Sequence, residues 1–124
     1  MSKDKLPIKV FKDEHNVIHS PDISLAFVES IMPDLEGTIL RLFCKRGDSK
    51  EKYNTRLYTN RNEEVWLSGF TCGKSNAGTF GLCELMVMLG WDSWIPRELM
   101  VKIVLSNNKF MIQFEGPGHK LVIH

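Results

Sequence analysis

Residues 39–70 have the sequence ILRLFCKRGDSKEKYNTRLYTNRNEEVWLSGF, which contains three strand-like segments. The first, residues 39–45, is apolar on both faces and indicates a central strand of a sheet. Residues 53–59 and 65–70 each alternate polar and apolar side chains, and Asn60-Arg61-Asn62 lies between them as a turn. We therefore expect a central strand followed by a β-hairpin, with an antiparallel sheet as the basis of the fold.

The segment before this stretch predicts a further hairpin and a helix. Residues 8–12 and 17–19 have strand character and flank a polar turn. Ser20 then offers a helix N-cap, and Pro21 suits the first helical position. We expect a helix over residues 21–32.

Two patterns overlap in that expected helix. Ile23, Phe27 and Ile31 recur at a spacing of four, which is typical of a helix. Ile23, Leu25 and Phe27 also alternate, so a strand stays open as the alternative interpretation.

The segment before Gly90 contains the clearest helical pattern in the chain. Leu82, Leu85, Met86 and Leu89 form one apolar stripe, and Gly90 suits the position just after a helix end.

The C-terminal part predicts a second hairpin. Residues 99–105 and 110–114 alternate apolar and polar side chains, and Asn107-Asn108 supplies the turn between them. Residues 121–123 add an edge strand. Together these elements predict an α+β fold, with a mainly antiparallel sheet and two helices in one compact domain over the whole chain.

The composition is that of a globular domain with nearly neutral charge. The chain has 124 residues, of which 43% are hydrophobic, and a formal net charge of +1. These values exclude a disordered chain and count against a protein that grips a nucleic-acid duplex along its backbone. No apolar run approaches the ~18 residues of a membrane span, and no signal peptide is recognisable. Three cysteines without a CxxC pair fit a reducing compartment, so we expect a cytoplasmic protein.

A glycine-rich stretch, residues 67–81, leads from the expected hairpin into the helix before Gly90. Its glycines let a ligand approach the backbone, and the free amides of a first helical turn attract an anion. Gly73-Lys74-Ser75 is similar to the end of a P-loop, but the glycine spacing does not fit, which excludes an NTPase. We interpret the stretch as a loop that contacts phosphate or nucleotide, with a turn-forming connection as the alternative.

Positive charge is concentrated next to that loop. Between Arg41 and Glu63, seven basic and three acidic residues leave +4 in a chain of +1. Arg41 and Arg56 lie inside expected strands, where a guanidinium needs a carboxylate or phosphate partner; a solvated hairpin is the alternative. Aromatic rings that could stack on a nucleobase bracket the loop and the helix: Phe70, Phe80, Trp91 and Trp94.

Candidate catalytic and metal-binding groups are few. His15 and His19 stand four residues apart, but they flank an expected turn and have no third ligand. Cys72 has no histidine placed to activate it, and the acidic residues form no paired carboxylates. We therefore expect a protein that is not an enzyme and that uses no catalytic residue, metal or cofactor.

The middle third of the chain combines several of these features. They are the hairpin with Arg56, the run WLSGFTCG over residues 66–73, Gly78 and Gly81, and a helix that ends Leu89-Gly90-Trp91. Together they resemble the phage-encoded Thoeris anti-defence 1 family. Lys74, Ser75 and Asn76 stand where that family has a more glycine-rich loop.

The resemblance implies a nucleotide sponge. Members of that family bind cyclic ADP-ribose isomers, such as glycocyclic ADP-ribose, or related cyclic nucleotides that signal in bacterial TIR-domain immunity. They hold the ligand uncleaved in the host cytoplasm, as homodimers or higher homo-oligomers with pockets at the subunit interface. For this chain the resemblance implies that Arg56 contacts a pyrophosphate and that Phe70 or Phe80 stacks on adenine. The expected ligand-binding residues are Arg41, Arg56, Gly69, Phe70, Thr71, Gly73, Lys74, Ser75, Asn76, Gly78, Thr79, Phe80 and Trp91.

Two other functions stay open. A small nucleic-acid-binding regulator would use the basic patch with Tyr53, Tyr58 and Trp66, because aromatic rings between arginines on a sheet suit single strands. The near-neutral net charge makes nucleic acid the less favoured partner. A protein-contact inhibitor would instead use exposed tryptophans as anchors.

Overall fold

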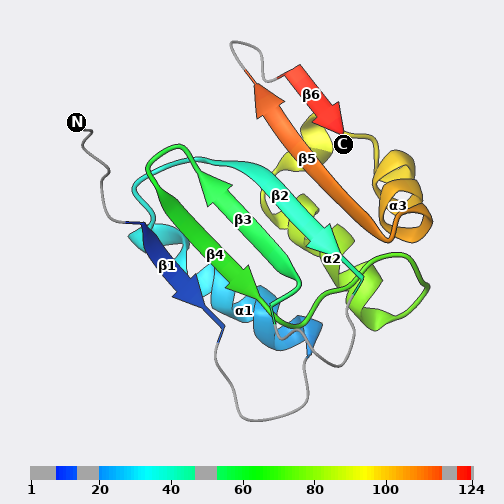
Figure 1. Ribbon diagram of the computed structural model, residues 1–124, viewed down its shortest axis with the longest axis horizontal. Coiled ribbons are helices and arrows are strands. Elements are labelled where there is room, and N and C mark those ends of the chain that lie inside the picture. The colour runs from blue at the N-terminus through cyan, green and yellow to red at the C-terminus, as the bar shows by residue number, and fades with distance from the viewer. Residues whose placement is uncertain (1–7, 14–19, 47–52, 116–119, 124) are drawn as a thin grey trace.

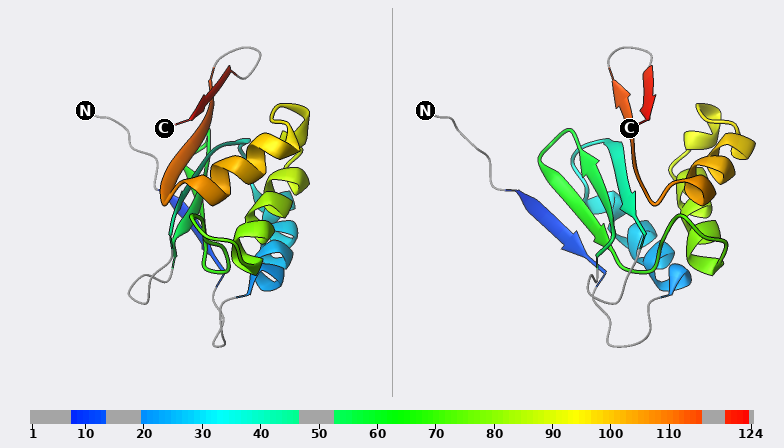
Figure 2. Two further views of the ribbon diagram at one scale, coloured as in Figure 1. Left: turned by 90° about the vertical axis from the view of Figure 1, so that its right-hand side faces the viewer. Right: turned by 45° about the vertical axis from the view of Figure 1, so that its right-hand side comes forward.

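The computed structural model describes residues 8–13, 20–46, 53–115 and 120–123, with residues 115 and 120–123 described by their backbone only. These residues form a six-stranded sheet with helices packed against one of its faces (Figures 1 and 2). The left view of Figure 2 shows the sheet nearly edge-on, with all the helices on the same side. Within the described ranges, no helix or strand covers the opposite face.

The sheet is mixed but mainly antiparallel. Its strand order is β1-β4-β3-β2-β5-β6, and every neighbouring pair is antiparallel except β1 and β4, which run parallel. The strands are β1 (Lys9–Lys12), β2 (Ile39–Lys45), β3 (Thr55–Thr59), β4 (Glu63–Leu67), β5 (Lys109–Glu115) and β6 (Lys120–Ile123).

Three α-helices and two short 3₁₀ turns form the second layer. The α-helices are α1 (Pro21–Ile31), α2 (Ala77–Met88) and α3 (Arg97–Ser106), and the 3₁₀ turns are Met32–Asp34 and Trp91–Ser93. The buried residues of α1, Ser24, Val28 and Ile31, recur at helical spacing and face the sheet layer.

The hydrophobic core lies between the sheet and the helices. Alternate residues of the central strands point into it, because successive side chains of a strand face opposite sides of a sheet. Its fully buried members include, from the sheet, Leu42, Leu57, Val65, Leu67 and Ile112, and, from the helices, Val28, Leu82, Leu85, Met86 and Val104.

Most of the predicted elements are confirmed. The fold is α+β, β2 is a central strand, and β3 and β4 form the predicted hairpin around the turn at residues 60–62. The helix over residues 21–32 forms as α1, and Pro21 occupies its first turn. Gly90 follows the end of α2 with φ of 80°, a left-handed conformation that glycine adopts without strain.

The predicted strand over residues 99–105 is wrong, because this segment belongs to α3. The described part of the chain therefore has three α-helices, not two. Apolar residues do alternate here, but the buried residues are Met100, Ile103 and Val104, which follow helical spacing. The predicted second hairpin is replaced by α3 followed directly by β5.

The N-terminal strand forms, and its described partner is distant in sequence. β1 pairs in parallel with β4, from Lys9 opposite Glu63 to Lys12 opposite Trp66. The returning segment of the predicted hairpin, residues 17–19, lies outside the described residues.

None of the helices in the described ranges combines the length and the apolar character that a bilayer crossing requires.

Candidate functional site

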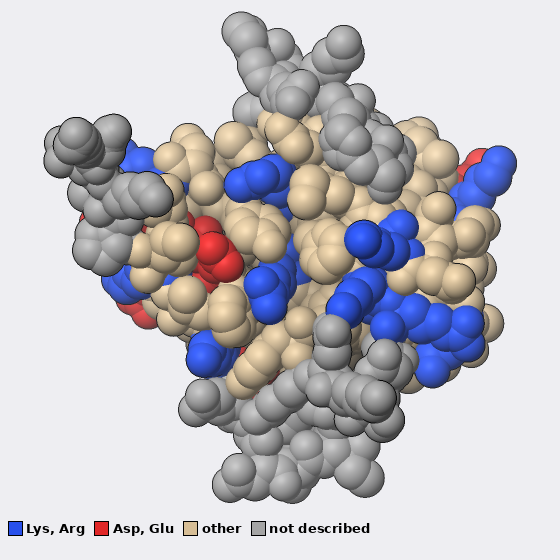
Figure 3. Space-filling model, in the orientation of Figure 1, with Lys and Arg blue, Asp and Glu red and all other residues tan. Residues whose placement is uncertain are grey.

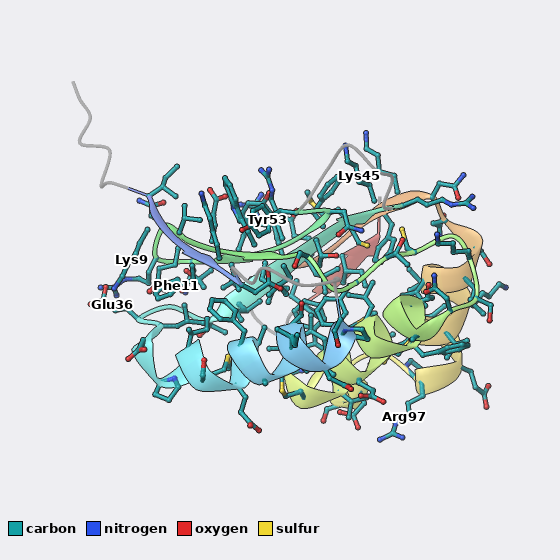
Figure 4. All side chains as sticks on the ribbon, turned by 90° about the horizontal axis from the view of Figure 1, so that it is seen from below. Lys9, Phe11, Glu36, Lys45, Tyr53 and Arg97 are labelled. Carbon is teal, nitrogen blue, oxygen red and sulfur yellow. The ribbon has the colours of Figure 1, made fainter. Side chains whose placement is uncertain are left out.

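The sheet face that carries no helix displays aromatic and basic side chains. In β3, Thr55 and Leu57 are buried under the helices, so Arg56 and Tyr58 point to the other side. Tyr53, just before β3, points the same way (Figure 4). We call this surface the open face; alternation along the strands also gives it Val10, Lys12, Arg41, Phe43, Lys45, Glu64, Trp66, Lys109, Met111 and Gln113.

The register of the strands aligns these side chains in two rows that cross the sheet from β1 to β5. Paired residues on neighbouring strands have Cβ atoms about 5 Å apart, so the side chains within one row are neighbours. The first row is Lys12, Trp66, Arg56, Phe43 and Met111, and the second is Val10, Glu64, Tyr58, Arg41 and Gln113.

Cations lie against the aromatic rings of both rows. The guanidinium carbon of Arg56 is 4.2 Å from the centre of the Trp66 ring, and Nζ of Lys12 is 5.0 Å from it. In the second row, the guanidinium carbon of Arg41 lies 4.8 Å from the Tyr58 ring. Stacking on a ring holds the flat guanidinium along the surface of the sheet, where its N–H groups can donate hydrogen bonds to a phosphate.

Positive charge dominates the open face. Among the side chains that the structure describes there, Lys12, Arg41, Lys45, Arg56 and Lys109 face one carboxylate, Glu64, which gives five minus one, or +4. Figure 3 shows basic side chains spread over this face with little acidic surface between them.

The two arginines of the open face have no acidic partner among the described residues. Arg41 and Arg56 contact aromatic rings instead. The ion pair that the described residues do form joins Arg97 to Asp92 on the helical side. An unpaired guanidinium on a strand favours an external phosphate.

The glycine-rich loop lies between β4 and α2 and is held by backbone hydrogen bonds. The amide of Ser68 donates to the buried carboxylate of Asp13, and the amide of Gly69 donates to Oγ of Ser24, at 2.9 Å. The amide of Gly73 donates to the Val104 carbonyl of α3, at 2.7 Å. These bonds attach the loop to Asp13, which directly follows β1, and to α1 and α3.

Asn76 is the N-cap of α2. Its Oδ1 accepts a hydrogen bond from the Thr79 amide at 3.0 Å, which uses one of the free amides of the first turn. α2 begins at Ala77, so Lys74 and Ser75 precede the helix.

A shallow hollow of about 380 Å³ lies beside this loop. Its lining combines the loop with the first residue of α1 and a buried asparagine, and it comprises Pro21, Asn54, Ser68, Gly69, Phe70, Thr71, Lys74, Asn76, Ala77 and Gly78.

The structure separates the expected site residues into different regions. Arg41 and Arg56 lie on the open face, whereas the glycine-rich loop packs against the helices. Six of them line the hollow: Gly69, Phe70, Thr71, Lys74, Asn76 and Gly78. Gly73, Ser75 and Thr79 lie elsewhere in the loop and in the first turn of α2.

The expected stacking rings also differ in their surroundings. Phe70 is only 2% exposed and lies in the core, whereas Phe80 is 46% exposed on α2. Trp91 is buried beyond the other end of α2, where its ring packs edge-to-face on the Phe114 ring with the ring centres 4.8 Å apart.

The open face contains residues that the sequence-based site did not include. These residues are Lys12, Phe43, Glu64, Lys109 and Met111. Phe43 shares a strand face with Arg41, whereas Lys12, Lys109 and Met111 join the arginines only through the strand order. The sequence does indicate which residues of each strand share a face, because these positions alternate with apolar positions that are buried.

Cys44 and Cys72 are fully buried next to each other. Contact with the Cys72 thiol and burial raise the pKa of the Cys44 thiol, and the contact with Cys44 lowers the pKa of Cys72. Neither side chain is exposed, so in this conformation a substrate has no access to either sulfur. Among the described residues, no group of three histidine, cysteine or acidic side chains could hold a metal ion.

Comparisons with protein-family models, curated proteins and solved structures found no match to this chain. The resemblance to the Thoeris anti-defence 1 family therefore stays a prediction from residues.

Proposed function

We propose that this protein binds single-stranded nucleic acid on the open face of its sheet. The observation that carries the proposal is the first row, in which Lys12, Trp66, Arg56 and Phe43 alternate cation and ring across four adjacent strands. Rings stack on bases, and the cations between them meet the phosphates that join those bases.

A single strand fits this face better than a duplex. Bases in a duplex are already stacked and paired, so they cannot lie on side-chain rings. The net charge of +1 counts against binding of a long nucleic acid. The charge of +4 on the open face nevertheless favours a short single strand. Stacking contributes about 1–3 kcal/mol per base by alanine substitution.

The proposal is tested by fluorescence anisotropy with a labelled oligo(dT). We expect Arg56→Ala and Trp66→Ala each to weaken binding by roughly ten-fold or more, because each removes a phosphate contact or a stacking surface. Arg97→Ala removes the same charge from the helical side and should bind as the wild type does. No binding by the wild type at low salt would overturn the proposal.

A second candidate is capture of a cyclic nucleotide, and the hollow beside the glycine-rich loop supports it. Lys74 is exposed at this hollow, and Gly69 and Gly78 bring the backbone close to it. In this case the protein would hold a cyclic ADP-ribose isomer uncleaved in the host cytoplasm, as a homo-oligomer with shared pockets.

Calorimetry with a cyclic ADP-ribose isomer separates the two candidates. Capture at the hollow predicts that Lys74→Ala weakens binding and Arg56→Ala does not. The resemblance alone would instead assign Arg56 to the pyrophosphate, so a loss in both variants would indicate a site that spans both regions in an oligomer. No heat with the isomer would remove this candidate.

A further inference from the structure

Glu64 is an acidic residue at the centre of the basic open face. It stands in the second row between Val10 and Tyr58, and it shares its strand face with Trp66, two residues further along β4. Among the side chains described on this face, it is the one carboxylate. Two of its neighbours, Tyr58 and Trp66, are rings on which bases would stack.

The carboxylate is held in place by the indole of Trp66. Nε1 of Trp66 donates a hydrogen bond to Oε1 of Glu64 at 2.9 Å. No other hydrogen bond or ion pair joins Glu64 to the described residues, although five cations share its face. The second oxygen, Oε2, thus has no described partner, and the half-buried side chain is oriented before any ligand arrives.

A fixed carboxylate discriminates between bases by its acceptors. Guanine presents two adjacent donors, N1–H and the N2 amino group, on its Watson–Crick edge, and these match the two oxygens of a carboxylate. Thymine and uracil present carbonyl oxygens on either side of a single N–H, so the same carboxylate meets two acceptors. Single-stranded bases are read by hydrogen bonds to these edges.

We propose that Glu64 is a specificity-determining residue that selects guanine at the base stacked beside Trp66 or Tyr58. This inference rests on the proposed function, because it needs a base on the open face. The structural reason is that Trp66 supplies both the stacking surface and the hydrogen bond that orients the reading group.

The test compares oligonucleotides of equal length made of repeated TTG, repeated TTI and thymine alone, where I is inosine. For the wild type we expect repeated TTG to bind roughly ten-fold more tightly than oligo(dT). Inosine keeps N1–H but lacks the N2 amino group, so repeated TTI should bind with intermediate affinity.

Glu64→Gln is the informative variant. Its side-chain oxygen can still accept the Trp66 indole N–H, so the fold is preserved while the second acceptor becomes a donor. We expect the preference for guanine over thymine to fall towards one, and binding of oligo(dT) to strengthen because a negative charge is lost. Glu29→Gln, on the exposed side of α1, makes the same charge change away from the face and should keep the preference.

The outcomes separate this inference from the proposed function. If the wild type binds none of the oligonucleotides, the proposed function fails. If it binds them all without preference for guanine, or if Glu64→Gln keeps the wild-type preference, nucleic-acid binding stands and the role of Glu64 is overturned.

Discussion

Glu63, the first residue of β4, is a buried carboxylate that holds the segment leading into β2. The amides of Glu36 and Gly37 donate to it at 2.8–3.1 Å, and Oγ1 of Thr59 donates at 3.0 Å. Burial acts to raise the pKa of Glu63, but these hydrogen bonds and the charge of Lys9 outweigh burial and hold that pKa below its ordinary value.

A lowered pKa makes Glu63 a source of acid sensitivity. Its contribution to stability is present above the ordinary carboxyl pKa of 4.5 and is lost as the pH falls through the lower folded-state value. We expect Glu63→Gln to be less stable at neutral pH by about 2 kcal/mol, and to lose less further stability in acid than the wild type. Urea unfolding at neutral and acid pH measures both effects.

The matched control for this prediction is Glu36→Gln. Glu36 is exposed, and its backbone amide, not its carboxylate, binds Glu63. The Glu36→Gln variant should therefore be as stable as the wild type at both pH values. Equal acid sensitivity of Glu63→Gln and the wild type would contradict the assigned role.

Buried acids of this kind could not be recognised from the sequence. Asp13 lies in a polar, turn-like segment and Glu63 follows an Asn-Arg-Asn turn, so both have the pattern of surface charges. Their partners are backbone amides far along the chain: Ser68 is 55 residues from Asp13, and Glu36 is 27 residues from Glu63.

At the scale of elements, α1 and α2 pack closely where α2 has a glycine. A Cβ on Gly81 would lie 2.5 Å from Cβ of Pro21 in α1, and 3.3 Å from the Phe70 ring. A Cβ on Gly78, one turn earlier in α2, would meet its nearest neighbour, Thr71, at 3.2 Å. Gly81 therefore has no room for a methyl group, whereas a methyl group at Gly78 requires only a small shift of the Thr71 side chain.

We expect Gly81→Ala to destabilise the fold by about 1–3 kcal/mol, because the helices must separate to admit the methyl group. Gly78→Ala should stay within about 1 kcal/mol of the wild type, since the better helix propensity of alanine offsets the tight contact. Thermal unfolding of the two variants side by side measures this difference. A smaller loss for Gly81→Ala than for Gly78→Ala would contradict the packing described.

Local patterns predicted most elements, and α3 shows where they fail. The β3–β4 hairpin follows from its own turn and alternation, so sequence neighbours were sufficient. In α3, apolar residues occur both in alternation and at helical spacing, and packing against α2 decides which set is buried. The parallel pairing of β1 with β4 depends on the whole chain path, so no local pattern indicates it.

At the scale of the whole molecule, helices on one side of the sheet leave the other side as a continuous surface. The open face gathers residues from β1 to β5, between positions 10 and 113 of the sequence. The basic patch between Arg41 and Glu63 and the rings of Tyr53, Tyr58 and Trp66 could be predicted from sequence. Lys12, Lys109 and Met111 could not, because only the strand order brings them beside that patch.

Binding on this face should depend strongly on salt. Contacts from three to five of its cations to phosphates of a single strand predict that log Kd rises with log salt concentration with a slope of about 2 to 3.5. Anisotropy titrations of oligo(dT) over a range of sodium chloride concentrations measure the slope, and Arg56→Ala should lower it by about 0.7. A slope near zero would show that phosphates are not bound.

The most direct test of nucleic-acid binding on the open face is amide chemical-shift mapping of isotope-labelled protein with oligo(dT). We predict that the largest shifts occur in β2, β3 and β4, around Phe43, Arg56 and Trp66, while residues 69–80 change little. Shifts confined to residues 69–80, with the strands unaffected, would contradict binding on the open face and place the ligand in the hollow beside the glycine-rich loop.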